Sequence, residues 1–334
     1  MKIKDFFNTV TYRETGVKHL EKGKGCEDNV YKSFSNETGV KVIALSDGAG
    51  SYENAAIGSE TASRVAAGLI AHKFNLLYDL DSETAASYIL REVTIPLRIL
   101  AEETGKDLIS YSATLLCAAM HPDGRYFLFH VGDGAIVGYN IRRGCETVSL
   151  YEHEGPANQA TFVTVENTDY YLKKGSGDYI SFILMSDGPE DFLVNEIEVN
   201  PRVKMMVQLS YFVSEESMVE QLISLINLLK ENGMGDDASF AVIIDTRAIS
   251  DMFANLTPEL RTTLFNLDSD ICSKKMQRVQ DVLNIISLYP NGVRLTQISC
   301  QLHVHKPKIA KKKIGFMLDM KLIECNNGKY YISK

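Results

Sequence analysis

Two long amphipathic stretches, set among short apolar runs, constrain the fold of this chain most. The stretches cover 55–74 and 82–103, and in the second the apolar residues recur at spacings of three and four, as in a helix with one buried face. Apolar runs that mostly end at Gly, Asp, Asn or Pro predict strands over 40–45, 113–120, 126–131, 135–140, 161–166, 179–185 and 239–245. Tight turns link most of them, so we expect an α+β fold with antiparallel sheets and helices packed outside.

The last part of the chain has a different pattern. We predict helices over 200–212 and 214–232, a connecting segment over 249–271, and helices over 275–289, 295–302 and 306–320. A two-stranded hairpin around an Asn-Gly turn follows the last helix. Three helices followed by a hairpin make the outline of a winged helix. We therefore expect a first domain over 1–248 and a small winged-helix-like domain over 272–334.

Charge also separates these two parts. The chain has a net charge of −8, but residues 272–334 hold 12 Lys and Arg against 3 Asp and Glu, a net +9, which leaves −17 for residues 1–271. Such a split indicates two units with different partners. The basic run at the third C-terminal helix admits three interpretations: a solvated helix face, contact with nucleic-acid phosphates, or docking to an acidic partner or to the acidic unit. Its residues are Lys306, Lys308, Lys311, Lys312 and Lys313.

Composition narrows the classes of protein. With 334 residues, 45% hydrophobic and 23% charged, the chain has the make-up of a soluble globular protein. No apolar run approaches the roughly 18 residues that span a bilayer, and the N-terminus has no signal-peptide pattern, so we expect a cytoplasmic protein without a membrane partner. The 6 cysteines show no CxxC spacing, which favours free thiols. Cys300, His303 and His305 are a weak zinc candidate, because a fourth ligand is missing.

Acidic residues recur where apolar runs end or beside Gly. They are Glu27-Asp28, Asp47-Gly48, Asp133-Gly134, Asp187-Gly188 and Asp236-Asp237. A single Asp-Gly is more often a turn than a ligand, and we interpret Asp123-Gly124 as a hairpin turn only. Several such carboxylates gathered at the mouth of a sheet would repel one another unless divalent cations held them. Ligation by oxygen alone selects Mg²⁺ or Mn²⁺ over Zn²⁺.

The order of these motifs resembles the metal-dependent protein phosphatase 2C family, in particular its compact bacterial branch. The resemblance covers about residues 9–245 and combines six motifs, each weak alone. They are Gly16-Val-Lys-His19 with Gly25-Cys26-Glu27-Asp28, then Ser46-Asp47-Gly48-Ala-Gly50-Ser51, Ser112-Ala-Thr114, Val131-Gly-Asp133, Met185-Ser-Asp187-Gly188, and Asp236-Asp237-Ala-Ser. It implies a four-layer αββα sandwich of two antiparallel sheets flanked by helices.

The resemblance also implies a role for each matching residue. Two ions of Mg²⁺ or Mn²⁺ would be held, with Asp47 bridging them and the Gly48 carbonyl ligating one. Asp187 and Asp236 would complete the first ion, while Glu27 or Asp28, which the sequence leaves open, would serve the second. Asp133 would help to hold a third, looser ion, and Thr114 would have a structural position in its strand.

The implied activity is hydrolysis of phosphoserine and phosphothreonine in proteins. A water activated between the two ions, held by Asp47, Asp187 and Asp236, would attack the phosphorus in line. The partners implied are a phosphorylated protein substrate and a cognate Ser/Thr kinase. No covalent enzyme intermediate is needed, so Cys26 is expected to be a packed thiol.

Two positions depart from the family pattern. Many members carry an Arg before the acidic pair to bind the substrate phosphate, and here that position is Gly23. His19, Lys22 or Lys24 would supply that contact instead. Some members have a His as general acid after the Asp-Gly, and here that position is Ala49.

These departures keep two rival functions open. The first is a sensor, adaptor or DNA-binding regulator whose phosphatase-like domain turns over little. The second is a metal-dependent hydrolase of a small phosphorylated metabolite, which would show no preference for phosphoproteins.

Overall fold

The computed structural model describes residues 4–150, 161–195, 198–265, 273–304 and 307–333. The chain divides into two compact units. Unit 1 comprises Thr9–Val207 and Glu215–Ile244, and unit 2 comprises Lys4–Asn8, Gln208–Ser214 and the chain from Asp245 onward. This division lies close to the end of the first predicted domain, whose boundary at 248, like that at 272, stays a prediction.

Unit 1 contains two five-stranded antiparallel sheets. One has the order β2-β3-β4-β5-β8 and the other β1-β10-β9-β6-β7. The strands of the first are β2 (Asn29–Phe34), β3 (Lys41–Ser46), β4 (Leu115–Met120), β5 (Arg125–Val131) and β8 (Tyr171–Ser176). Those of the second are β1 (Phe7–Glu14), β10 (Ala238–Asp245), β9 (Ser181–Met185), β6 (Ala135–Asn140) and β7 (Gly144–Leu150). The sheets face each other, with β9 packed against β3 and β4.

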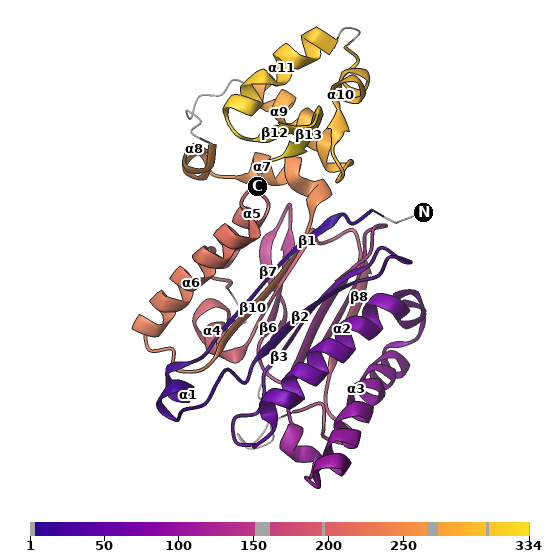
Figure 1. The fold of residues 1–334 in the computed structure, drawn as a ribbon, viewed down its shortest axis with the longest axis vertical. Helices are drawn as coiled ribbons and strands as arrows, with labels where there is room; N and C mark the ends of the chain where they lie inside the picture. The colour runs from indigo at the N-terminus through magenta and orange to yellow at the C-terminus, as the bar shows by residue number, and fades with distance from the viewer. Residues whose placement is uncertain (1–3, 151–160, 196–197, 266–272, 305–306, 334) are drawn as a thin grey trace. The chain divides into compact units, whose positions relative to one another are not determined.

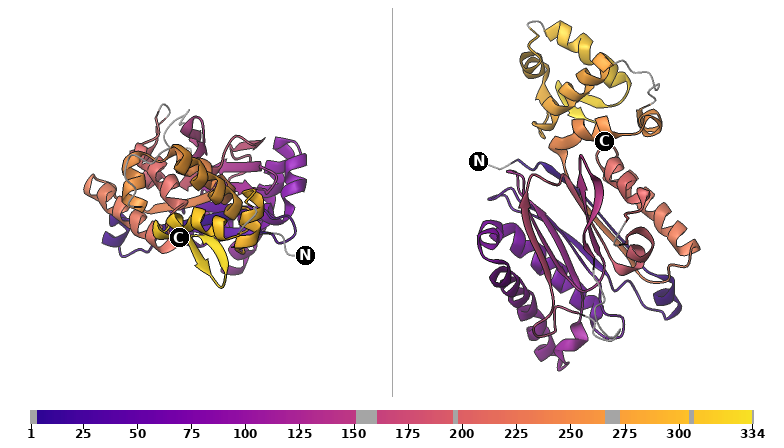
Figure 2. Two further views of the ribbon diagram at one scale, coloured as in Figure 1. Left: turned by 90° about the horizontal axis from the view of Figure 1, so that it is seen from above. Right: turned by 180° about the vertical axis from the view of Figure 1, so that it is seen from behind.

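Helices cover the outer faces of both sheets (Figures 1 and 2). The long helices α2 (Ala55–Asp79) and α3 (Ser82–Thr104) lie on the β2-β3-β4-β5-β8 side, where α2 packs on β2, β3 and β4. Helices α4 (Asp187–Leu193) and α6 (Glu215–Glu231) lie on the other side, together with α5 (Pro201–Ser210). The expected pair of antiparallel sheets flanked by helices is confirmed.

The sequence of α3 shows why these elements form. Asp81 caps its start, where the carboxylate accepts a hydrogen bond from the Thr84 backbone N–H at 2.9 Å. Its apolar positions Ile89, Val93 and Leu97 are completely buried and belong to the core between α2, α3 and the sheet beneath them. Gly105, with φ of 64°, ends the helix in the left-handed conformation that glycine adopts most readily.

Short elements connect the sheets. Helix α1 (Val17–Glu21) follows β1, and the 3₁₀ turn η1 (Leu108–Tyr111) precedes β4. Both lie next to loops that carry predicted site residues. Their positions therefore matter for the site described below.

Unit 2 contains the C-terminal elements. They are η2 (Thr246–Ala248), α7 (Ile249–Asn255), α8 (Pro258–Phe265), α9 (Ser273–Ser287), β11 (Val293–Arg294), α10 (Leu295–Gln301), α11 (Pro307–Asp319), β12 (Ile323–Asn326) and β13 (Lys329–Ile332). The three strands form a small antiparallel sheet in the order β11-β13-β12. The β12–β13 turn holds Asn327 and Gly328 at φ of 50° and 73°, the conformation that an Asn-Gly hairpin turn requires.

One predicted strand is wrong. Residues 161–166 form turns and irregular backbone, although the segment holds the apolar residues Phe162, Val163 and Val165. The Val163 N–H donates a hydrogen bond to the carbonyl of Ala113, just before β4, at 3.0 Å. The place beside β5 is taken by β8, so the segment does not pair with that strand.

Two further expectations concern thiols and membranes. Cys26, Cys117, Cys145, Cys300 and Cys325 are free, while Cys272 lies outside the described residues. Cys300 and His303 are both exposed, and His305 and Lys306 also lie outside the described residues. In the described part of the chain no helix combines the length and the apolar character needed to cross a bilayer.

Candidate active site

Loops at one end of the two sheets of unit 1 surround a cavity of about 260 Å³, which we call the acidic cavity. Four predicted carboxylates line it together with the predicted Gly48: Asp47, Asp133, Asp187 and Asp236. Asp47 follows β3, Asp133 lies between β5 and β6, Asp187 begins α4 after β9, and Asp236 precedes β10. Residues distant in sequence thus meet because their strands end at the same edge of the sandwich.

Thr114 holds the backbone of Asp47. The Asp47 N–H donates to Thr114 Oγ1 at 2.9 Å, and the Thr114 N–H donates to the Asp47 carbonyl at 2.8 Å. The Ser46 hydroxyl also donates to the Thr114 carbonyl. These contacts join the ends of β3 and β4 and fix the backbone that presents Asp47 to the cavity.

Asp133 lies in a turn between two glycines whose backbone conformation other residues rarely adopt. Gly132 and Gly134 have φ of 89° and 92°, in the left-handed region that disfavours other residues. A Cβ on Gly134 would lie 2.6 Å from the carbonyl oxygen of Met185, the last residue of β9. The turn is therefore pressed against the strand that delivers Asp187.

The carboxylates of the cavity disfavour one another's charge. Burial raises the pKa of Asp47 well above its usual value, and the charges of Asp28 and Asp187 raise it further. Burial raises the pKa of Asp133 to about 7, with Asp187 adding to the effect. The pKa of Asp187 is also raised, by burial first and then by the charge of Asp236 despite hydrogen bonds that oppose the shift. A cluster of this kind stores repulsion that a cation would relieve.

Glu27 and Asp28 have different surroundings, and neither is among the residues that line the acidic cavity. Asp28 is completely buried, and neither carboxylate oxygen has a hydrogen-bond partner among the described residues. Burial raises its pKa to about 6, although nearby side chains, first that of Asp47, oppose the shift. Glu27 Oε1 lies 3.0 Å from Lys24 Nζ, and its Oε2 lies 3.5 Å from His19 Nε2.

The donor set fits a hard divalent cation. Every candidate ligand is a carboxylate or a backbone oxygen, which Mg²⁺ and Mn²⁺ prefer. The buried, unpartnered oxygens of Asp28 and Glu27 Oε2 are groups that a cation or its water shell would satisfy. Among the described residues, no three His, Cys, Asp or Glu side chains already have the close spacing of a bound-ion site. The assignment of a divalent cation therefore rests on the oxygen-only donor set and on the repulsion between its carboxylates.

Asp237, beside the predicted ligand Asp236, ties three segments together. Its buried carboxylate accepts hydrogen bonds from the N–H groups of Gly16 and Glu27, both at 2.6 Å. Its Oδ2 also lies 2.9 Å from His19 Nδ1. Asp237 therefore anchors the loop before α1, the α1 helix and the loop before β2 to the start of β10.

The predicted phosphate contacts fall into two groups. Lys22 and His19 line the acidic cavity, but His19 is buried and lies against Asp237 and Glu27. Lys24 Nζ donates to Glu27 Oε1 and to the Gly50 carbonyl, both at 3.0 Å. The cavity contains another cation that sequence reasoning missed, Lys18, whose exposed Nζ lies 3.6 Å from Asp236 Oδ2.

Two residues near the predicted ligands, the second of them outside the cavity lining, bear on the chemistry of the cavity. Ala49 lines it and offers no proton donor, as the sequence indicated. Glu190, one helical turn after Asp187 in α4, was missed from the sequence. Burial raises its pKa to about 7, with Asp191 and Asp187 contributing. Its i+3 spacing from Asp187 was the signal that could have found it.

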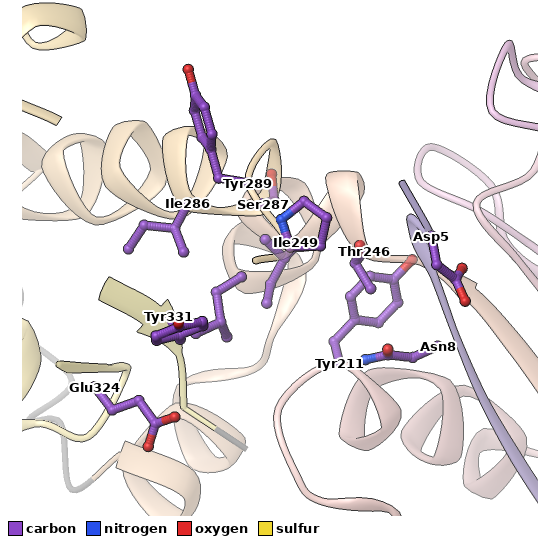
Figure 3. A pocket seen from close by; sticks show the side chains of 12 residues that line it. Asp5, Asn8, Tyr211, Thr246, Ile249, Ile286, Ser287, Tyr289, Glu324 and Tyr331 are labelled. Carbon is purple, nitrogen blue, oxygen red and sulfur yellow. The ribbon is translucent and has the colours of Figure 1, made fainter. Parts of the chain in front are cut away.

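Unit 2 has a cavity of about 300 Å³ of another kind (Figure 3). Three tyrosines and three isoleucines account for half of its lining, with Tyr211, Tyr289 and Tyr331 labelled in the figure. It holds none of the paired carboxylates that the sequence singled out. The acidic cavity is therefore the candidate active site.

The fold and the motifs agree with known proteins. A model of the protein phosphatase 2C family matches residues 15–227 of this chain. The structure is similar to that of a bacterial serine phosphatase, with 18% sequence identity, a TM-score of 0.52 and coverage of 72% of this chain and 98% of that one. It is also similar to the serine/threonine phosphatase Stp1 from Staphylococcus aureus, with 17% identity, a TM-score of 0.51 and coverage of 73% and 97%.

A search of curated proteins gives no match. The family model nevertheless covers more than half of the chain and includes the loops that carry Asp47, Asp133 and Asp187. At 17–18% identity the solved structures establish the fold alone, and that fold has the same two-sheet architecture. The chain belongs to the protein phosphatase 2C family.

Proposed function

We propose that this chain is a Mg²⁺- or Mn²⁺-dependent phosphatase that hydrolyses phosphoserine and phosphothreonine esters in proteins. One observation carries the proposal: Asp47, Asp133, Asp187 and Asp236 come from four separate loops into one cavity. The pKa values of the first three are raised, by burial first and then by neighbouring carboxylates, which is costly unless the site serves to bind cations. If these aspartates served only to form turns, their carboxylates would not need to lie in the same cavity.

The residues that would hold the cations follow from the family. Asp47 would bridge two ions, the Gly48 carbonyl, Asp187 and Asp236 would complete one, and Glu27 or Asp28 would serve the other. Asp133 would help to hold a third. When bound, the ions would lower the pKa of a water and neutralise charge on the phosphoryl oxygens. Asp28 is completely buried and has no ion-pair partner among the described residues, whereas Glu27 Oε1 lies 3.0 Å from Lys24 Nζ, so we assign Asp28 rather than Glu27 to the second ion.

The other residues of the cavity bind and orient the substrate. Lys18 and Lys22, both exposed at the cavity, would pair with the phosphoryl oxygens in place of the missing Arg. His19 is held between Asp237 and Glu27, so we propose that it positions the loop. Lys24 would do the same through Glu27 and the Gly50 carbonyl. Since Ala49 has no proton to give, the leaving oxygen would take its proton from solvent water.

The surroundings of the cavity favour a protein substrate over a small metabolite. A groove of about 540 Å³ lies between α3 and residues 163–170, and it includes Arg91 and Arg98 on one face of α3. No carboxylate among the described residues pairs with the exposed Arg98. Thr164, in the groove, lies 2.7 Å from the Ser112 hydroxyl, and the Ser112 carbonyl accepts from the N–H of Ala49 at 3.0 Å. The groove and the acidic cavity are adjacent along the chain, since Phe162 lines the cavity and Val163 lines the groove. The groove would hold chain that flanks a phosphoresidue.

The test is Mn²⁺-dependent phosphate release from p-nitrophenyl phosphate and from a phosphothreonine peptide. We expect Asp187→Asn to abolish turnover of both substrates, whereas Asp123→Asn, in an Asp-Gly turn outside the cavity, leaves it near that of the wild type. Absence of turnover in folded, metal-loaded wild-type protein would refute the enzyme and favour a sensor or adaptor.

A second variant separates the two substrate classes. Arg98→Glu should raise KM for an acidic phosphopeptide by roughly 3–10-fold, the effect of one lost and reversed charge contact, while p-nitrophenyl phosphate hydrolysis is unchanged. Equal loss with both substrates, or none with either, would contradict a docking role for the groove. A phosphoprotein substrate would in turn require a Ser/Thr kinase that supplies it.

A further inference from the structure

The C-terminal part of unit 2 concentrates positive charge on one helix. Helix α11 carries Lys308, Lys311 and Lys312 at positions i, i+3 and i+4, which share one face of a helix. All three are exposed. The opposite face buries Ala310, Ile314 and Met317 in the core of the unit. The lysines therefore form a single stripe directed away from the core.

No carboxylate neutralises this stripe. Among the described residues, none of the three lysines takes part in an ion pair or a hydrogen bond. The one acidic residue of the helix is Asp319, at its last position. Residues 272–334 as a whole carry 12 basic against 3 acidic residues. Such an uncompensated stripe favours a polyanionic partner.

The shape of the stripe suits close approach. Gly315 continues the same face one turn after the lysines, and a Cβ built there would meet nothing within 4 Å. The helix can therefore lie close to a partner along its first two turns. Ile309, beside the lysines, is 47% exposed and offers an apolar contact. Lysines for phosphates and an aliphatic side chain for a thymine methyl are the contacts that a helix uses in a DNA groove.

The elements around α11 are arranged as in known DNA-binding modules. Helix α10 packs against α11, both pack against α9, and the chain between them spans only 302–306. The β12–β13 hairpin follows directly, and residues 324–328 at its tip are exposed. A second helix presented by a first, with a hairpin beside it, is the geometry that places an α-helix in the major groove.

We propose that the C-terminal part of unit 2, residues 273–333, is a winged-helix module that binds duplex DNA, with α11 in the major groove and Lys308, Lys311 and Lys312 on the phosphates. The inference does not depend on the phosphatase activity. An acidic protein would also attract lysines, but the combination of a lysine stripe, an exposed Ile309 and an open Gly315 beside a hairpin favours a groove over a flat acidic surface.

The test measures binding of a short fluorescein-labelled DNA duplex to the full-length chain by anisotropy, across about 50–200 mM salt. Wild type should bind at low salt, and the logarithm of its binding constant should fall linearly with the logarithm of the salt concentration. The variant Lys308→Gln/Lys311→Gln/Lys312→Gln should reduce the steepness of that dependence by about 3, one for each lost phosphate contact.

A matched control removes the same charge elsewhere. Arg64→Gln/Lys73→Gln/Arg202→Gln changes three exposed cations outside this module and should leave DNA binding unchanged. Hydrolysis of p-nitrophenyl phosphate and circular dichroism of each variant show that it is folded. Equal loss in both triple variants, or no binding by wild type at low salt, would overturn the proposal. Displacement of the duplex by poly-glutamate as readily as by unlabelled DNA would also overturn it, in favour of an acidic protein partner.

Discussion

Strand β5 has an Asp-Gly dipeptide near each end, and the two have opposite environments. Before the strand, the Asp123 carboxylate lies 2.8 Å from Arg125 Nε and 2.7 Å from His121 Nδ1. Burial acts to raise its pKa, but the hydrogen bonds from Arg125 and His121 outweigh it and lower the pKa. After the strand, burial first and then the charge of Asp187 raise the pKa of Asp133 to about 7.

The two aspartates differ in the residues that surround them, not in their local backbone conformation. Both aspartates are followed by a glycine with φ above 90°, so their local conformation is similar. What differs is the neighbourhood: Asp123 is half-exposed and surrounded by its own hairpin, whereas Asp133 faces carboxylates from other strands. The dipeptide makes the turn, and the distant neighbours make the site.

The largest expected effect is a difference in phosphatase activity between variants at the two ends of the sandwich. Asp47→Asn should lower kcat/KM for p-nitrophenyl phosphate by about 10²–10³-fold, because it would remove a ligand of the proposed cations that stabilise transition-state charge. Asp123→Asn should change it less than about twofold. Steady-state assays with Mn²⁺ check both variants. Comparable losses would mean that Asp47 has no more than a structural role.

The second prediction uses the glycines of the two turns. Gly124→Ala should destabilise the fold by about 1 kcal/mol, the cost of a left-handed alanine, since the nearest atom to its Cβ would be 3.8 Å away. Gly134→Ala should cost about 3 kcal/mol, because its Cβ would also lie 2.6 Å from the Met185 carbonyl oxygen. Urea unfolding measures both. Equal costs would show that the turn at Asp133 can move away from β9.

The third prediction concerns pH in the metal-free protein. Asp28 and Asp133 have folded-state pKa values raised from 3.8 to about 6 and about 7, so their stabilisation is complete below pH 4 and is lost as pH rises through 6–7. Between pH 6 and 8 the free energy of unfolding should fall by about 2 kcal/mol. Excess Mn²⁺ should remove the trend. Stability that rises over this range in EDTA would contradict the clustered carboxylates.

The smallest expected effects are changes in stability, which should have opposite signs for Asn substitutions at the two ends of β5. In EDTA at pH 8, Asp133→Asn should stabilise the fold by about 1 kcal/mol, since it relieves repulsion. Asp123→Asn should destabilise it by about 0.5 kcal/mol, since it weakens an exposed contact with Arg125. Thermal unfolding of both variants tests the sign. Destabilisation by Asp133→Asn would show that its carboxylate makes a favourable contact in the metal-free state.

Periodicity predicted the buried elements well. Strand β6 has the predicted bounds, Ala135–Asn140, and α3 ends within one residue of its prediction. Strands β1, β2, β7 and β8 were missed. No residue of β2 or β8 is fully buried and β7 buries only Ser149, so these sequences lack an apolar face. Strand β1 was missed although it buries Phe7, Thr9 and Val10. Residues 161–166 were predicted as a strand from their apolar, β-prone residues, which do not show whether a segment pairs with another strand.

The acidic motifs of the site were visible in sequence, but its contacts were not. Asp47, Asp133 and Asp187 each follow an apolar run, Asp236 follows Gly235, and all four line one cavity. The approach of Lys18 to Asp236 joins opposite ends of unit 1, so no local pattern could show it. The role of Asp237 was hidden for the same reason, since its donors, Gly16 and Glu27, lie at the start of the chain.

The position of β10 has a consequence for the newly made chain. This strand is the last of unit 1 to leave the ribosome, yet it lies between β1, the first, and β9 in its sheet. It begins directly after Asp236 and Asp237, so the N-terminal loops that Asp237 holds have no anchor until then. A nascent chain that ends before residue 236 therefore has neither a complete sheet nor a formed cavity. Translation of nearly all of unit 1 must therefore precede formation of the acidic cavity.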